Sequence, residues 1–175
     1  MQPSPFKTAV NFGAMSGLSC FAIFVILYKM GINPLGPGSW LAVWIPPTFI
    51  VIATKRFRDY ECGGFISFTS AFRTGLLTAM SGGLLYALLI YIFGTLIDAT
   101  LLDNFKALML ADLEQTEGMI RSVVGDSVYE QSIEEMKNTT LKSIAMTDFL
   151  YKFFGGVIIS LITAAFLKRN HPEII

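Results

Sequence analysis

The sequence has few charged side chains, few cysteines and one histidine. Lys, Arg, Asp and Glu make up 15% of the 175 residues, against about 25% in soluble domains. Thirteen basic residues balance thirteen acidic ones, so the net charge of zero gives no attraction to nucleic acid. Two cysteines are too few for a scaffold built on disulfides. This composition argues against a disordered chain and against a soluble enzyme.

Motifs of metal, cofactor or catalytic sites are also missing from the sequence. The single histidine, His171, lies in the tail beside Pro172. No zinc-protease, paired-cysteine, nucleophile-elbow or phosphate-loop motif is present. We therefore expect no catalytic residue, no cofactor, no metal ligand and no enzymatic activity.

Apolar residues are abundant: they form 53% of the chain, and the mean hydropathy is +0.58. About 20 apolar helical residues cross the hydrocarbon of a bilayer. Four stretches are long enough, at residues 9–28, 35–54, 74–97 and 149–167. None has Asp, Glu or Arg in its middle, where a charge costs about 2.5 kcal/mol or more. Backbone groups in lipid must bond internally, so the sequence predicts an all-α bundle of four transmembrane helices.

Basic side chains predict how the bundle is oriented. They precede the first span, separate the second from the third and follow the fourth, at Lys7, Lys55, Arg56, Arg58, Arg73, Lys168 and Arg169. Short basic loops stay in the cytoplasm, so both termini are predicted to be cytoplasmic. The long loop at residues 98–148 then lies outside. It carries ten acidic and four basic residues, a net charge of −6.

Prolines and glycines mark special positions in the spans. Pro46 and Pro47 have no N–H and should kink the second span, either as a hinge lining a cavity or as a static bend filled by neighbours. Small residues let helices approach closely, which serves either a homodimer or packing within one bundle. The glycines expected in such contacts are Gly13, Gly17, Gly82, Gly83, Gly155 and Gly156.

Three ionisable residues lie near the predicted outer ends of spans three and four. Asp98 ends the third span, and Asp148 and Lys152 lie one helical turn apart at the start of the fourth. We expect an ion pair between Asp98 and Lys152 at the rim that ties the two spans together. A proton relay is the alternative, since transporters keep ionisable groups within the membrane.

The loop between the second and third spans suggests an interfacial helix at residues 60–73. Gly63 and Gly64 permit a sharp turn, and Phe65, Phe68 and Phe72 share one helical face. Such a helix binds lipid or a partner, or it simply leads the chain back into the membrane.

Two stretches carry a resemblance to a known family. They are Lys55-Arg56-Phe57-Arg58-Asp59 with Gly63-Gly64-Phe65-Ile66-Ser67-Phe68, and the ending Gly155 to Arg169. The chain resembles a bacteroidete family of small four-helix integral membrane proteins catalogued as a domain of unknown function. The resemblance implies four helices with a long loop between the third and fourth. It also implies the inner membrane of a diderm bacterium and a periplasmic loop, and it implies no activity.

The long outer loop is itself predicted to be helical. Apolar residues recur at three- and four-residue steps from Leu102 to Val124, and Gly125 offers a helix stop. Glu117 and Arg121 are spaced to form a helical ion pair. Packed on themselves, these helices form either a cap on the bundle or a docking surface for a basic partner.

These observations favour a non-catalytic scaffold or accessory subunit. Its expected partners are membrane lipids and a protein bound through the acidic loop or a second copy of the chain, and not nucleic acid. The alternative is a small transporter or channel with the Pro46-Pro47 break in its pathway.

Overall fold

The computed structural model of the chain describes residues 4–169, so His171 lies outside the described residues. Apart from one isolated bridge, this part of the chain forms helices and their connections, and the predicted all-α fold is confirmed. Four helical segments are long and apolar enough to cross a membrane. They are α1 (Phe6–Lys29), the segment Pro37–Glu61, the segment Phe68–Ile97 and α7 (Leu141–Leu167).

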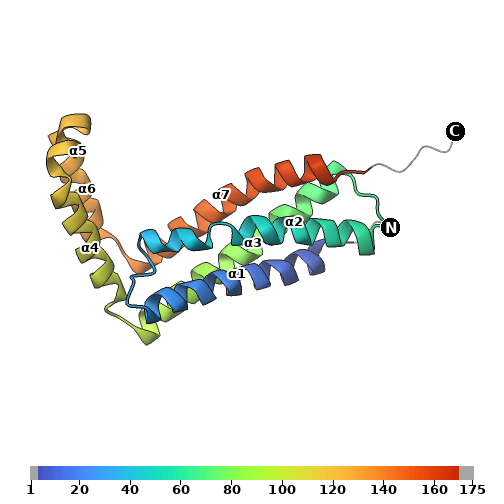
Figure 1. Ribbon diagram of the computed structural model, residues 1–175, viewed down its shortest axis with the longest axis horizontal. Helices are drawn as coiled ribbons and strands as arrows, with labels where there is room; N and C mark the ends of the chain where they lie inside the picture. The colour runs from blue at the N-terminus through green and yellow to red at the C-terminus, as the bar shows by residue number, and fades with distance from the viewer. Residues whose placement is uncertain (1–3, 170–175) are drawn as a thin grey trace.

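The second and third segments each combine several helical types. The second consists of the 3₁₀ helix η1 (Pro37–Ala42), α2 (Ile45–Arg56) and the π-helical turn η2 (Phe57–Glu61). The third consists of α3 (Phe68–Ile92) and the π-helical turn η3 (Phe93–Ile97). α3 packs against α1, α2 and α7 and forms the centre of the bundle (Figure 1).

Three further helices form a unit at one end of the bundle. They are α4 (Leu101–Gln115), α5 (Glu117–Val124) and α6 (Asp126–Asn138), which we call the arm. Figure 1 shows the arm at a steep angle to the bundle, at the end away from the two termini. We call these the arm end and the termini end of the bundle.

An aromatic and aliphatic core joins the arm to the bundle. The Phe93 ring meets Phe24 and Tyr28 edge to face, with ring centres 5.2 and 5.0 Å apart. Leu101 at the start of α4 and Leu141 at the start of α7 are buried in the same cluster. Both ends of the arm are therefore anchored by apolar contacts.

The separate interfacial helix predicted at residues 60–73 is wrong. The chain turns at Gly63 and Gly64, and α3 begins at Phe68 with Ser67 as its N-cap, whose hydroxyl accepts a hydrogen bond from the Ser70 N–H. Residues 68–73 are thus the first turns of a membrane-length helix. The sequence pattern failed here because one amphipathic turn looks the same whether the helix stops or continues.

Candidate functional site

The Lys152 ammonium and the Asp148 carboxylate form an ion pair one turn apart on α7. The Lys152 nitrogen lies 2.7 and 2.6 Å from the two carboxylate oxygens. The same nitrogen lies 4.1 Å from the centre of the Tyr86 ring on α3. Both ionised side chains are largely buried, with 19% of Lys152 and 27% of Asp148 exposed.

This pair lies between the helices of the bundle, and Lys152 is far from the first residue of α7. α7 starts at Leu141, before the span predicted at residues 149–167, so Lys152 is about three turns inside the helix. The Cβ position of Gly83, near the middle of the segment Phe68–Ile97, is 3.7 Å from the Lys152 Cβ. Lys152 is therefore a charged residue in the middle of the membrane-length bundle.

The predicted ion pair between Asp98 and Lys152 does not form. Asp98 instead ends the third segment and accepts hydrogen bonds from the Thr100 hydroxyl at 2.7 Å and from the Thr100 N–H at 2.9 Å. These bonds, with one from Tyr28, hold the pKa of the Asp98 carboxyl below its usual value. Lys152 is already paired within its own helix, so it has no need of a partner at the bundle end.

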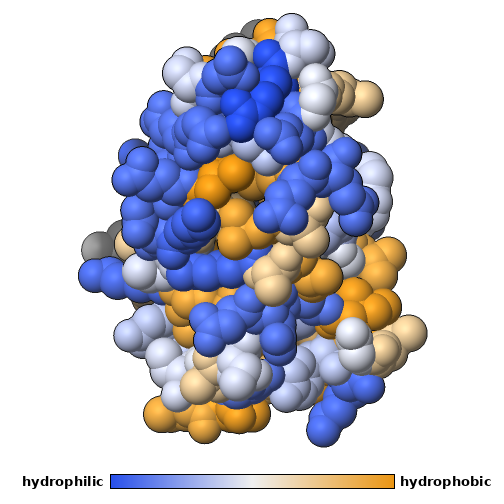
Figure 2. All heavy atoms as spheres, turned by 90° about the vertical axis from the view of Figure 1, so that its left-hand side faces the viewer, coloured by the Kyte–Doolittle hydropathy of each residue, from blue (hydrophilic) through white to orange (hydrophobic). Residues whose placement is uncertain are grey.

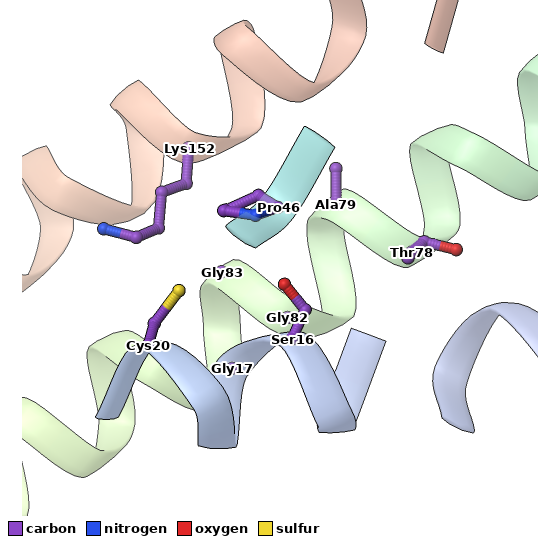
Figure 3. Close-up of a pocket in the computed structure, with 9 residues that line it drawn as sticks. All are labelled: Ser16, Gly17, Cys20, Pro46, Thr78, Ala79, Gly82, Gly83 and Lys152. Carbon is purple, nitrogen blue, oxygen red and sulfur yellow. The ribbon is translucent and has the colours of Figure 1, made fainter. Parts of the chain in front are cut away.

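A small cavity lies beside Lys152 and brings together four helices (Figure 3). Ser16, Gly17 and Cys20 of α1 line it with Pro46 of α2, Thr78, Ala79, Gly82 and Gly83 of α3, and Lys152 of α7. In Figure 3 the Lys152 side chain and the Cys20 sulfur extend toward the same space. Its volume of about 10 Å³ is at the lower limit for holding one water molecule.

The predicted break at Pro46 and Pro47 falls on one wall of this cavity. Both prolines lie in the first turn of α2, after η1 has ended at Ala42. Because proline has no N–H, the carbonyls of Ala42 and Val43 receive no helical hydrogen bond from these two positions. The helix of the second segment is therefore interrupted beside the cavity that Pro46 and Lys152 both line.

The glycines pack α1 and α7 closely onto α3. A Cβ on Gly13 would lie 2.7 Å from the Thr78 carbonyl oxygen, and one on Gly17 would lie 2.7 Å from the Gly82 carbonyl oxygen. A Cβ on Gly82 would lie 2.8 Å from the Gly13 carbonyl oxygen. On α7, a Cβ on Gly156 would collide with Ala79. These contacts place Gly13 and Gly17 inside one bundle.

Gly155 does not belong to this set, and its predicted packing role is wrong. A Cβ there would have nothing within 4 Å. Adjacent residues on a helix point in directions about 100° apart, so only Gly156 of this pair faces α3.

At the termini end, the loop between α2 and α3 is tied to the end of α7. Gly63 and Gly64 have φ values of 62° and 88°, which only glycine adopts easily. Ile66 and Arg169 exchange two backbone hydrogen bonds of 2.9 Å each. The Phe68 and Phe72 rings stack at 6.5 Å, and Phe72 packs against buried residues of the bundle.

Arg121 holds the arm together. Its guanidinium donates hydrogen bonds to Glu117 at 2.7 Å, Asp126 at 2.8 Å and Glu130 at 2.5 Å, which confirms the expected Glu117–Arg121 pair. It also lies 4.3 Å from the centre of the Tyr129 ring, which is 2% exposed. Bonds to Asp126, Glu130 and Glu117 raise the pKa of Arg121, and burial raises that of Tyr129. α5 and α6 are thus fixed to each other.

The surface of the arm is acidic, with apolar residues exposed near its tip. Met119 is 71% exposed and Val123 77% exposed, and Val124 and Val128 are also exposed. Figure 2, which faces the arm, shows hydrophilic residues over much of this surface around a smaller apolar area. Lys106 links α4 to α6 by a 2.8 Å hydrogen bond to the Lys137 carbonyl. The arm is a braced helical unit and not a loose loop.

A family model described as "Protein of unknown function (DUF4199)" matches residues 11–169. The chain belongs to this family. The match covers most of α1 and all of the other three apolar segments and the arm, and it confirms the resemblance to a family of unknown function. No curated protein matches the chain, and no solved structure matches it. The four apolar helices indicate a multi-pass membrane protein.

Two features of the candidate site were not found from the sequence. Tyr86 of α3 and Cys20 of α1 lie near Lys152 of α7. The spacing of residues along one helix does not show how the neighbouring helices are rotated about their own axes. The Arg121–Tyr129 contact joins two arm helices across a turn.

In the described residues, no three His, Cys, Asp or Glu side chains gather closely enough to hold a metal ion.

Proposed function

We propose that this protein is a non-catalytic membrane scaffold or accessory subunit that presents its arm to a protein partner outside the bilayer. The observation that carries this proposal is the braced arm, whose acidic helices stand away from the bundle (Figure 1) and expose Met119 and Val123 near the tip. An apolar patch with a charged rim is typical of protein-binding surfaces.

The proposed orientation puts both termini in the cytoplasm and the arm in the periplasm of a bacterial inner membrane. The basic residues that support it lie at the termini end. Lys55 and Arg56 end α2, and Arg169 pairs with Ile66 beside the turn between α2 and α3. The arm end has the acidic segment. Lys and Arg near the ends of spans favour the cytoplasmic side.

The proposed partner is a protein with a basic surface. The segment at residues 98–148 has a net charge of −6, and complementary charge speeds association and excludes like-charged partners. The same charge disfavours nucleic acid and disfavours pairing of two arms. Anionic lipids contact the basic termini end instead.

Photo-crosslinking in native membranes tests the proposed function. A crosslinking residue at Val123 on the arm tip should capture a discrete protein with a basic surface, identified by mass spectrometry. The same residue at Phe166, which is 84% exposed on α7, is the control and should capture lipid. Reversing the charges at Glu134 and Glu135 should abolish the Val123 product. Recovery of an intact monomer without any copurifying protein after mild solubilisation would contradict the proposal.

A small transporter is the second candidate, because the broken second segment lines a cavity that holds a charged residue. Broken helices beside mid-membrane polar groups are a feature of transporters. Purified protein in liposomes should then carry a proton or ion flux that Lys152→Met abolishes. Flux that is absent, or that is unchanged in Lys152→Met and Pro46→Ala, would remove this candidate.

A further inference from the structure

An open cleft of about 460 Å³ lies where the end of α6 meets the start of α7. We call it the α6–α7 cleft. All of its lining residues are polar: Gln131, Glu134, Glu135, Asn138, Thr139 and Ser143. Sites for small molecules commonly have volumes of about 300–1,000 Å³. The cleft is therefore large enough to hold a small polar group.

The cleft lies at the depth of lipid head groups. Ser143 in its wall and Lys168 at the opposite end of α7 are about 38 Å apart along the helix. A bilayer with its head groups is about 40–45 Å thick, so an α7 that places Lys168 in one head-group layer places Ser143 in the other. The arm meets this end of the bundle at a steep angle (Figure 1). α6 therefore runs across the surface of that leaflet.

An exposed apolar stripe on α7 continues from the cleft. Met146, Leu150 and Phe154 follow Ser143 at steps of three and four residues, so they share its face of the helix. Their exposed fractions are 52%, 41% and 60%. Because α7 is long and apolar enough to cross a membrane, acyl chains cover this stripe. A phospholipid whose chains lie on the stripe has its head group at the cleft.

The two walls of the cleft differ in charge. On α6, the carboxylates of Glu134 and Glu135 form no ion pair within the part of the chain that the structure describes. The other wall is the first turn of α7, where the N–H groups of Leu141 and Lys142 precede the first helical hydrogen bond and the Lys142 side chain is exposed. The N-terminus of a helix attracts anions. A head group with one positive and one negative charge complements both walls.

We propose that the α6–α7 cleft binds the head group of phosphatidylethanolamine from the leaflet on the arm side. The ammonium of the lipid donates N–H hydrogen bonds to Glu134 and Glu135, and its phosphodiester lies toward the first turn of α7. Charge-assisted bonds of this kind are the stronger ones. A choline head group has no N–H to donate, and an anionic lipid brings only negative charge to the carboxylates. The site does not depend on the protein partner proposed for the arm.

Competition between two zwitterionic lipids tests the head-group preference. The purified full chain in mild detergent is mixed with equal amounts of phosphatidylethanolamine and phosphatidylcholine that have identical acyl chains, and native mass spectrometry measures the lipid retained. The parent should retain several-fold more phosphatidylethanolamine. Glu134→Gln/Glu135→Gln should remove this preference, whereas the matched control Asp112→Asn/Glu114→Gln, on exposed residues of α4, should keep it. Equal retention by the parent, or a preference that survives Glu134→Gln/Glu135→Gln, would overturn the proposal.

Carbodiimide coupling tests the position of the head group. This reagent activates a carboxylate, which then forms an amide with a primary amine. In phosphatidylethanolamine vesicles, lipid should couple to Glu134 or Glu135 several-fold more than to Asp112 or Glu114 of the same chain, and phosphatidylcholine vesicles should give no lipid product. Even coupling over these four acids would contradict the site.

A lysine-rich peptide added to the phosphatidylethanolamine vesicles is the competitor in the coupling experiment. Lipid coupling at Glu134 and Glu135 should persist in its presence. Coupling of the peptide in place of the lipid would assign the cleft to a protein partner and overturn the lipid site. The competition between lipids contains no partner protein, so its failure is distinct from a failure of the proposed function.

Discussion

The Lys152 ammonium lies over the face of the Tyr86 ring, 4.1 Å from its centre, in the interior of the bundle. The ring carries negative charge on its face and attracts the cation where water does not screen it. Tyr86 is 3% exposed, so this attraction acts in a nearly dry environment. α3 and α7 are thus joined by a charge–ring contact as well as by close packing.

Replacing the ring of Tyr86 should therefore destabilise the bundle. Tyr86→Phe keeps the aromatic face and should unfold nearly as the parent does. Tyr86→Leu loses the face and should cost about 1–2 kcal/mol more than Tyr86→Phe. Thermal unfolding in detergent measures the difference. Equal unfolding temperatures for the two variants would show that the ring face contributes nothing.

Gly82 and Gly155 form a matched pair for testing helix approach. Gly82→Ala puts a methyl group 2.8 Å from the Gly13 carbonyl oxygen, so α1 must move and the expected cost is about 1–3 kcal/mol. Gly155→Ala meets open space and should be neutral or stabilising, because alanine favours the helix. Thermal unfolding of both variants checks this order, and a reversed order would contradict the packing.

Arg121 should control the stability of the arm alone. Arg121→Met removes three hydrogen bonds and the contact with Tyr129, so limited proteolysis within residues 117–138 should become several-fold faster. Arg121→Lys keeps the charge but not the planar fork, and it should give an intermediate rate. Lys142→Met, an exposed residue on α7, is the control. Unchanged cleavage in Arg121→Met would show that apolar contacts alone hold the arm.

Acid should weaken the junction of α3 and α4 through Asp98. The Thr100 hydroxyl, and then its N–H and Tyr28, favour the ionised form and lower the Asp98 pKa. A carboxyl with a lowered pKa stabilises the fold above its ordinary pKa of about 4, and this stabilisation is lost as the pH falls through the folded value. Asp98→Asn should therefore flatten the fall in unfolding temperature between about pH 5 and pH 3. A parallel curve for this variant would remove Asp98 as a cause.

Cysteine labelling tests the proposed orientation. In a Cys20→Ser background, Cys62 should react only when reagent reaches the cytoplasmic side, whereas a cysteine at Val123 should react from outside in spheroplasts. Burial raises the pKa of the Cys62 thiol, so the labelling needs a mildly alkaline buffer. Labelling of both positions from the same side would contradict the orientation.

Much of the fold follows from hydrophobicity alone. The four apolar segments could be predicted because each must satisfy its own backbone in lipid. Residues 141–148 are more polar than the span predicted at residues 149–167, yet they belong to the same helix α7, which Thr140 caps through Ser143. The predicted pair of Asp98 and Lys152 does not form because Lys152 lies about three turns inside α7 and pairs with Asp148.

The site itself depends on how the helices are rotated about their axes. The contact of Lys152 with Tyr86, and the shared cavity with Cys20 and Pro46, combine residues from four helices. The sequence of a single helix does not fix this rotation. Gly13, Gly17 and Gly82 indicated the correct packing faces of α1 and α3. The adjacent Gly155 and Gly156 did not show which of the two contacts α3.

The backbone bridge between Ile66 and Arg169 has a mechanical consequence. It holds the chain at one end of α7, and the other end of this unbroken helix, Leu141, follows shortly after the arm ends at Asn138. A partner that pulls on the arm would therefore apply force to one end of α7, while the two hydrogen bonds between Ile66 and Arg169 hold the other end in place. Torque applied outside the bilayer would be transmitted along α7, past Lys152, to the cytoplasmic surface in the proposed orientation.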